Sequence, residues 1–132
     1  KQRARKIINQ YNGYIAIDTL HLNGELTEGE NIADNGGLAI AYAAFKKTTQ
    51  GKRNEKINGL TPDQRFFMAA AQLWKIKIRP ERLRMLTLTD PHSSPMWRVN
   101  GPASNMPAFY QAFNVGPTDS MYLPDSLRVK IW

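Results

Sequence analysis

Apolar side chains recur along most of this chain at the three- to four-residue spacing that places them on one face of a helix. The first such pattern covers residues 4–11 and gathers Ile7, Ile8 and Tyr11 on one side, opposite basic residues. Asn12-Gly13 is a strong turn signal, so we expect a short basic helix that ends there.

A longer helical pattern follows Thr27, which is a favourable N-cap residue. It runs from 28 to about 50, where Gly51 ends it, and its apolar stripe consists of Leu38, Ala41, Tyr42 and Phe45. Gly36-Gly37 within this pattern cost about 1 kcal/mol apiece relative to Ala. Either the helix bends at these glycines or another backbone packs very close to them.

A third helix is expected to start at Thr61-Pro62-Asp63, which combines an N-cap, a proline at the first helical position and an acid in the first turn. Pro80 is expected to end this helix, whose shared apolar face consists of Phe67, Ala71, Trp74 and Ile78. Beyond it we expect a helical turn over 81–86, a loop over 90–95, a short helix around 108–113 and an irregular tail.

One stretch departs from helical spacing. Residues 14–22 are typical of a strand, and Asn23-Gly24 suits a type I′ turn, whose two central residues take positive φ. We therefore expect 20–22 to pair with 25–27 as a small hairpin. Since no repeat, low-complexity tract or linker interrupts the sequence, residues 1–132 are expected to form a single unit, mainly α with this hairpin near its start.

Composition removes several classes of function. The chain has no cysteine, which excludes disulfides, thiolate metal ligands and cysteine nucleophiles. No apolar run approaches the roughly 18 residues of a membrane span, and the basic start lacks the apolar region of a secretory signal. We therefore expect no membrane segment in this chain and any targeting signal outside it.

The formal net charge of +7 leaves two interpretations open. A basic protein can bind nucleic acid or another polyanion, but here the positive residues fall in separate groups at 1–6, 46–56 and 75–84, on expected helix ends or polar faces. We expect a solvated surface and no nucleic-acid partner. A non-catalytic basic binding module is the alternative.

Residues 29–37 read Gly-Glu-Asn-Ile-Ala-Asp-Asn-Gly-Gly. On a helix, Glu30 and Asp34 lie one turn apart on the same side, where two like charges repel unless a cation lies near them. A carboxylate that binds Zn²⁺, followed by a second carboxylate that accepts the free N–H of a ligating histidine, would use this spacing. Thr27 with Glu30 also matches a capping box, which is the simpler interpretation.

Residues 90–101 place His92 in a loop framed by prolines and Arg98 beside Trp97. His92 could donate a hydrogen bond to an oxyanion, and Arg98 could bind a carbonyl or carboxylate. A histidine that only satisfies local backbone, and an arginine stacked on tryptophan, are the alternatives. The chain has no HExxH, GxSxG or phosphate-binding glycine loop, so it does not contain a complete active site.

These two strings, in this order, resemble the C-terminal segment of the neprilysin family of zinc metallopeptidases, which includes endothelin-converting enzyme and bacterial oligopeptidase O. Further short matches follow the family's order at compatible distances: Leu22-Asn23-Gly24, Ala71-Gln72-Leu73-Trp74, Arg79-Pro80-Glu81, Ala112-Phe113 and Ile131-Trp132. The resemblance covers most of the chain. It implies the C-terminal part of a thermolysin-like (gluzincin) catalytic domain.

The resemblance also implies roles for individual residues. Glu30 would be the third zinc ligand, and Asp34 the acid that holds a zinc-binding histidine and assists proton transfer. His92 would stabilise the tetrahedral intermediate, and Arg98 would bind a backbone carbonyl of the substrate. In such enzymes an upstream HExxH supplies two histidine ligands and a catalytic glutamate, and this motif is expected before residue 1.

The implied activity is that of a zinc-dependent endopeptidase acting on oligopeptides. Trp74 and Val99 resemble the wall of a pocket for an apolar substrate side chain, although core packing explains Trp74 equally well. The isolated chain is expected to be inactive and to bind zinc weakly or not at all, because one carboxylate cannot complete a site that needs three protein ligands.

The expected partners are peptide substrates and the remainder of the catalytic domain, and exposed apolar faces predict some self-association of the isolated chain. Animal members of the family carry a cysteine near the C-terminal tryptophan, whereas residues 128–132 here have none. A bacterial enzyme that acts outside the cytoplasm is therefore expected. A degenerate relative that keeps the fold as a peptide-binding scaffold is a further alternative.

Overall fold

The computed structural model describes residues 1–131. In this range the helices are α1 (Gln2–Asn12), α2 (Glu28–Phe45), α3 (Thr49–Lys52), α4 (Pro62–Gln72), α5 (Pro80–Thr89), α6 (Pro95–Ser104) and α7 (Pro107–Phe113). The strands β1 (Ile15–Ile17) and β2 (Leu20–His21) form an antiparallel pair. The predicted mainly helical fold with a small β element near its start is confirmed. None of the helices in this range is long and apolar enough to cross a membrane.

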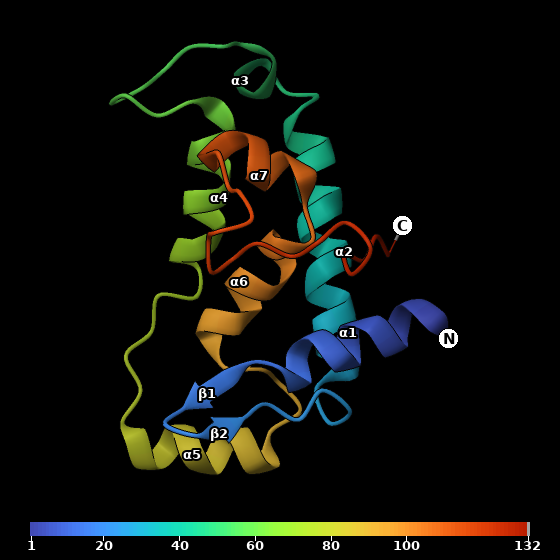
Figure 1. Cartoon of the computed structure of the whole chain (residues 1–132). Coiled ribbons are helices and arrows are strands. Elements are labelled where there is room, and N and C mark those ends of the chain that lie inside the picture. Colours follow the sequence, from blue (N-terminus) through green and yellow to red (C-terminus); the bar gives the residue numbers. More distant parts are fainter. Residues whose placement is uncertain (132) are drawn as a thin grey trace.

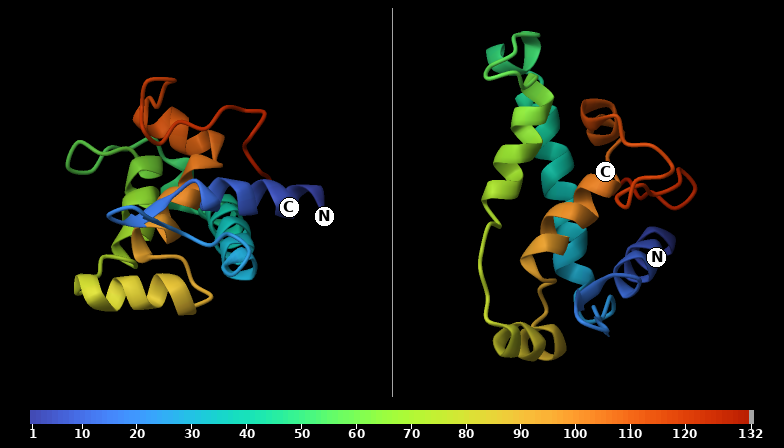
Figure 2. Two further views of the ribbon diagram at one scale, coloured as in Figure 1. Left: turned by 60° about the horizontal axis from the view of Figure 1, so that its bottom comes forward. Right: turned by 60° about the vertical axis from the view of Figure 1, so that its left-hand side comes forward.

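The long helix α2 runs along one side of the molecule for much of its length (Figure 1). α1 packs near its first turns, while α6 and α4 contact it along its length. The second panel of Figure 2 shows α2 and α4 side by side, with α6 beside α2. α7 lies against α4 toward the α3 end, whereas α5 lies at the opposite end against β1 and β2 (Figure 1).

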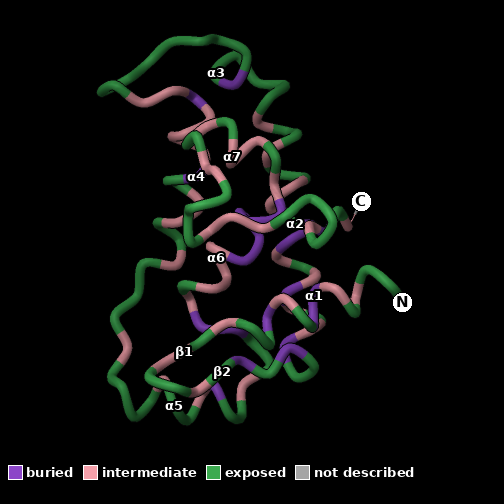
Figure 3. Tube along the Cα trace, in the orientation of Figure 1, coloured by how far each residue is buried: buried purple, intermediate pink, exposed green. Residues whose placement is uncertain are grey.

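The main core lies where α1, α6 and the C-terminal tail meet. Its buried members are Ile7, Tyr11, Leu22 and Val129, and the predicted apolar side of α1 is confirmed. Gly101 allows α6 to approach α1 this closely, because a Cβ at that position would lie 2.2 Å from the Tyr11 hydroxyl oxygen. Burial is therefore concentrated around α1, α2 and α6, while the α4–α5 connection and α5 are mostly exposed (Figure 3).

A second, aromatic cluster fills the space between α2, α4 and α7. The ring of Phe67 lies 5.5 Å from that of Tyr42 and 5.4 Å from that of Phe109, centroid to centroid. These are favourable distances for aromatic pairs. The cluster joins the helices that surround the large cavity described below.

The position predicted for the hairpin is wrong. Ile17 pairs with Leu20 across a turn that contains Asp18, whose φ is 50°. Asn23-Gly24 instead leads into α2, and the N–H of Gly24 donates to Asn12 Oδ1 at 2.6 Å. Glycine is needed here for close packing rather than for a positive φ, because a Cβ would lie 2.3 Å from the carbonyl oxygen of Ile8.

Two helix ends also differ from the prediction. α2 ends at Phe45, and Gly51 belongs to the separate α3, where a Cβ would lie 2.0 Å from the carbonyl oxygen of Phe45. α4 starts as predicted, with a capping box between Thr61 and Gln64. It ends at Gln72, so Trp74 and Ile78 follow the helix rather than sharing its face.

The prolines after α4 have a different role from the predicted one. Pro80 and Pro95 occupy the first position of α5 and α6, where a missing N–H has no structural cost. α5 therefore extends over ten residues, and α6 forms where no helix was expected. The irregular tail was predicted correctly for residues 114–131.

Candidate active site

The two informative strings of the sequence meet at the start of α2. Glu30 and Asp34 project from its first turns, His92 lies in the loop between α5 and α6, and Arg98 lies in the first turns of α6. The geometry brings all four side chains into direct contact through hydrogen bonds and ion pairs. Trp74, from the segment after α4, also reaches this cluster through Arg98.

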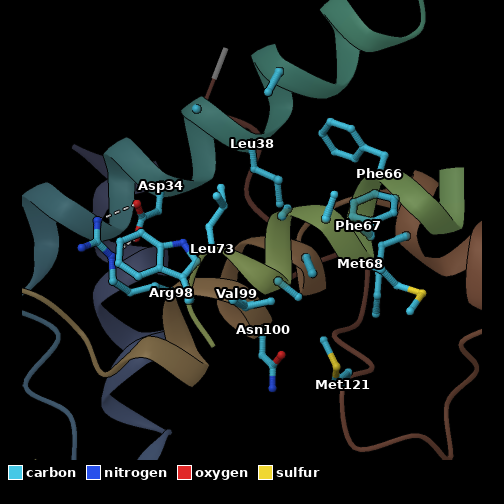
Figure 4. A pocket seen from close by; sticks show the side chains of 18 of the residues that line it. Asp34, Leu38, Phe66, Phe67, Met68, Leu73, Arg98, Val99, Asn100 and Met121 are labelled. Atoms are coloured by element: carbon cyan, nitrogen blue, oxygen red, sulfur yellow. Dashed lines mark hydrogen bonds and ion pairs between the residues drawn. The ribbon is translucent and has the colours of Figure 1, made fainter. Parts of the chain in front are cut away.

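Arg98 binds both oxygens of Asp34. Its Nε donates to Asp34 Oδ2 at 2.7 Å and its Nη2 donates to Asp34 Oδ1 at 2.8 Å (Figure 4). Both side chains are largely buried, with exposed fractions of 14% and 16%. The hydrogen bonds to Asp34 raise the pKa of Arg98 above its usual value, so the guanidinium is permanently charged. Arg98 therefore neutralises the carboxylate that the sequence places one turn after Glu30.

Glu30 lies between His92 and Arg98. Its Oε2 is 3.2 Å from Nε2 of His92 and 3.4 Å from Nη2 of Arg98. The capping box suggested for this residue is absent, because the helix start has no side-chain cap and the Thr27 hydroxyl bonds elsewhere. The Glu30 carboxylate, 40% exposed, is thus free of a role in the helix and faces the site.

His92 is oriented by Asp90, a residue for which no role was predicted. Asp90 Oδ1 accepts the backbone N–H of His92 at 2.8 Å and lies 2.7 Å from its Nδ1. The hydrogen bond from the backbone N–H of His92, followed by the bond with its ring, lowers the pKa of Asp90 below its usual range. Since a carboxylate can only accept, Nδ1 carries a proton and Nε2 is the nitrogen turned to Glu30. The Asp-Pro-His spacing was the available signal, because an aspartate commonly bonds the backbone two residues on.

Arg98 stacks on an aromatic ring, but not on that of its neighbour in sequence. Its guanidinium carbon lies 4.0 Å from the ring centroid of Trp74. Trp97 turns toward the core instead, where its ring stacks on Tyr14 at 3.8 Å. The stacking alternative for Arg98 is therefore correct in kind, and it accompanies the pairing with Asp34 rather than replacing it.

A cavity of about 610 Å³ opens beside the Arg98–Asp34 pair, between α2, α4 and α6. Trp74 lines it. So do Val99 and mostly apolar side chains that include Leu38, Phe67, Met68 and Leu73 (Figure 4). Leu73, 78% exposed, was not predicted to take part. Gly37 also borders the cavity, and apart from its chain neighbours and the adjoining backbone of α2 no heavy atom of residues 1–131 lies within 4 Å of a Cβ built there. The helix continues through both glycines, and close backbone packing at Gly37 is not found.

Residues 1–131 contain no group of three or more histidine, cysteine, aspartate or glutamate side chains that could hold a metal ion. Both oxygens of Asp34 are engaged by Arg98, whereas the contacts of Glu30 with Arg98 and His92 are made through Oε2. A tetrahedral zinc site needs three protein ligands or four. Residues 1–131 therefore do not form a complete zinc site by themselves.

Sequence comparison identifies the family. The sequence model of Peptidase family M13 matches residues 1–129. Neprilysin-1 of Caenorhabditis elegans is 40% identical over 137 aligned positions, covering 99% of this chain and 18% of that protein. Endothelin-converting enzyme 1 of Rattus norvegicus is 40% identical over 116 positions, covering 86% of this chain and 15% of that protein.

Solved structures agree with this assignment. The crystal structure of a zinc metalloprotease of Mycobacterium tuberculosis with an inhibitor superimposes with a TM-score of 0.93 at 40% identity, covering 99% of this chain and 21% of that one. PepO from Lactobacillus rhamnosis gives a TM-score of 0.83 at 37% identity, covering 99% and 19%. The chain spans about a fifth of the length of these relatives. It belongs to peptidase family M13, with neprilysin and endothelin-converting enzyme, and forms part of a catalytic domain of that family.

Proposed function

We propose that the full-length protein is a zinc-dependent endopeptidase that hydrolyses oligopeptides, and that this chain contributes Glu30 as the third zinc ligand. The observation that carries the proposal is the position of the Glu30 carboxylate. It is 40% exposed, it has no capping role, and it lies between His92 and Arg98, of which Arg98 lines the apolar cavity. A partly exposed carboxylate without a structural role in its helix is a suitable zinc ligand, and zinc supports carbonyl chemistry.

The two histidine ligands would come from an HExxH motif in another part of the full-length protein. Zinc, when bound, acts as a Lewis acid on a carbonyl oxygen and lowers the pKa of water to about 7. Asp34 would accept the free N–H of one ligating histidine. Although Arg98 occupies both oxygens of Asp34, a carboxylate offers about four acceptor positions, so one on each oxygen is still available.

His92 would act on the oxyanion of the transition state. Asp90 fixes its ring through Nδ1, so Nε2 is aimed into the site and, when protonated, can donate to a negatively charged oxygen. A preorganised donor of this kind needs no reorientation during the reaction. This supports a role in stabilising the tetrahedral intermediate.

Arg98 would bind a backbone carbonyl of the substrate through Nη1. In residues 1–131, Nε and Nη2 are the nitrogens of Arg98 that donate hydrogen bonds, whereas Nη1 has none. The pairing with Asp34 and the stacking on Trp74 hold the guanidinium still, so Nη1 presents two donors from a fixed plane. Trp74 and Val99 would form the wall against which an apolar substrate side chain packs.

The isolated chain would lack peptidase activity because it can offer zinc one carboxylate. Zinc analysis and peptide cleavage assays on the purified chain and on the full-length protein test this together. We expect stoichiometric zinc and cleavage for the full-length protein and neither for the chain. Tight stoichiometric zinc with cleavage by the chain alone would reject the division of the site, and a full-length protein without HExxH, zinc or cleavage would support the scaffold alternative.

The basic-module alternative gains little support from the first group of positive residues. Arg3 Nη1 donates to the carbonyl oxygen of Ile131 at 2.9 Å, and Lys6 Nζ donates to that of Ser126 at 2.7 Å. Part of the positive charge thus holds the C-terminal tail on α1. We further propose that the full-length protein acts outside the cytoplasm and is bacterial; the bacterial origin rests on residues 128–132, which contain no cysteine.

A further inference from the structure

A buried hydrogen bond lies directly behind the candidate active site. The hydroxyl of Ser93 donates to Oδ1 of Asn31 over 2.6 Å, and these residues are 3% and 0% exposed. Ser93 follows His92 in the chain, and Asn31 follows Glu30. The bond therefore joins the loop that carries His92 to the helix that carries Glu30. It is made by the buried residues directly next to His92 and Glu30 in the sequence.

The neighbours of Asn31 fix the direction of this bond. The Thr27 hydroxyl donates its proton to the carbonyl oxygen of Asn23 at 2.9 Å, so it can only accept from Nδ2 of Asn31, which lies 2.8 Å away. The amide oxygen of Asn31 must then face Ser93. Hydrogen bonds therefore run in one direction from Ser93 through Asn31 and Thr27 to the carbonyl oxygen of Asn23. Each of these side chains has a hydrogen-bond partner.

The exposed contact between His92 and Glu30 contributes little to holding the His92 loop in place. The side chains of His92 and Glu30 are 44% and 40% exposed, and an ion pair at such exposure contributes little to stability. A buried hydrogen bond between satisfied groups is costly to break, because it leaves an unpaired polar atom away from water. The position of His92 relative to Glu30 is therefore set mainly by the residues behind them.

We propose that Asn31 and Ser93 are positioning residues, which hold His92 at its working distance from Glu30 without touching substrate or metal. This inference rests on the proposed function, because it gives the pair a role in the reaction assigned to His92. It predicts that loss of the Ser93–Asn31 bond displaces His92 while α2 keeps Glu30 in place. The chemical step should suffer, whereas zinc binding should not.

The chain offers a matched control one residue further on. Ser94 is also a buried serine, 8% exposed, but its hydroxyl has no hydrogen-bond partner in residues 1–131. Replacing Ser94 by alanine removes the same atom from the same loop without breaking a hydrogen bond. Ser93→Ala and Ser94→Ala therefore differ in the one interaction under test.

The test is steady-state kinetics with zinc analysis on the full-length enzyme carrying Ser93→Ala, Ser94→Ala, Asn31→Leu or both Asn31→Leu and Ser93→Ala. We expect Ser93→Ala to lower kcat between about 10- and 100-fold, the scale for a catalytic group misplaced by up to an ångström. KM should change less than about twofold, and zinc should stay stoichiometric. Ser94→Ala should match the wild type, and Ser93→Thr, which keeps the donor, should recover most of kcat.

The double variant separates positioning from general destabilisation. If the bond is what positions His92, Ser93→Ala should have almost no further effect on kcat in the Asn31→Leu background. Equal kcat values for Ser93→Ala and Ser94→Ala, or additive losses in the double variant, would overturn the proposal. A wild-type protein without zinc or cleavage would instead contradict the proposed function, so the two failures are distinguishable.

Discussion

Arg98 and Asp34 form a two-point, largely buried ion pair that joins α6 to α2, with donor–acceptor distances of 2.7 and 2.8 Å. Removing the arginine would leave Asp34 charged, buried and unpaired. We expect Arg98→Ala to destabilise the fold by about 3 kcal/mol, the usual scale for a buried pair that loses one partner. Arg84→Ala is the control, since Arg84 pairs with Asp18 at an exposed site and should cost less than about 1 kcal/mol. The melting temperatures of Arg98→Ala and Arg84→Ala, each compared with that of the wild type, check this prediction. Equal shifts in the two variants would contradict it.

The same substitution should also affect catalysis. In the full-length enzyme, Arg98→Ala is expected to retain zinc and to weaken transition-state binding by about 1.5 to 3 kcal/mol, the scale of a charged hydrogen bond. Arg98→Lys should recover little, because an ammonium cannot bind both oxygens of Asp34 and offer a further fixed donor. The readout is kcat/KM at a temperature where all variants are folded. Unchanged kinetics in Arg98→Ala would reject the substrate-binding role.

His92 and His21 are the two histidines of the chain, and they allow a paired comparison. We expect His92→Phe to lower kcat of the full-length enzyme about 100- to 1,000-fold, as the loss of an oxyanion donor does, with zinc retained. His21 lies exposed on β2 and bonds the carbonyl oxygen of Asn12 through Nδ1, so His21→Phe should leave kcat unchanged. Similar effects of the two substitutions would remove His92 from the mechanism.

The apolar cavity predicts a preference for substrates. Val99 lines it, so Val99→Phe should reduce the space available and lower the ratio of kcat/KM for a peptide with a large apolar side chain to that for its alanine analogue by about tenfold. Ile40→Phe is the control, because Ile40 is 60% exposed on α2 and is not among the residues that line the cavity. Cleavage of two such peptides in competition measures the ratio. An unchanged ratio in Val99→Phe would show that the cavity does not receive the side chain.

The sequence predicted the helical fold well where local signals were unambiguous. Thr61-Pro62 began α4 as expected, because an N-cap followed by proline has one favourable local structure. Pro95 was misread, since a proline that ends a loop and a proline that starts a helix have the same local signature. The Asn23-Gly24 turn was also misread, because the contact that requires Gly24 comes from Ile8 on another element.

The candidate site shows the same division. The spacing of Glu30 and Asp34 and the resemblance of both strings pointed to the residues that the structure brings together. The pairing of Arg98 with Asp34, its stacking on Trp74 and the Ser93–Asn31 bond are all contacts between distant parts of the chain. No periodicity or motif specifies such partners, so they became visible only in the folded chain.

The assignment of Glu30 as a zinc ligand is tested most directly by the zinc content of the full-length protein carrying Glu30→Gln. Glu28→Gln is the matched control, because Glu28 lies in the same first turn of α2 and forms no ion pair within residues 1–131. Elemental analysis after dialysis should show that Glu30→Gln loses most of its zinc, while Glu28→Gln keeps one equivalent per chain. Stoichiometric zinc in Glu30→Gln, at the affinity of the wild type, would contradict the account.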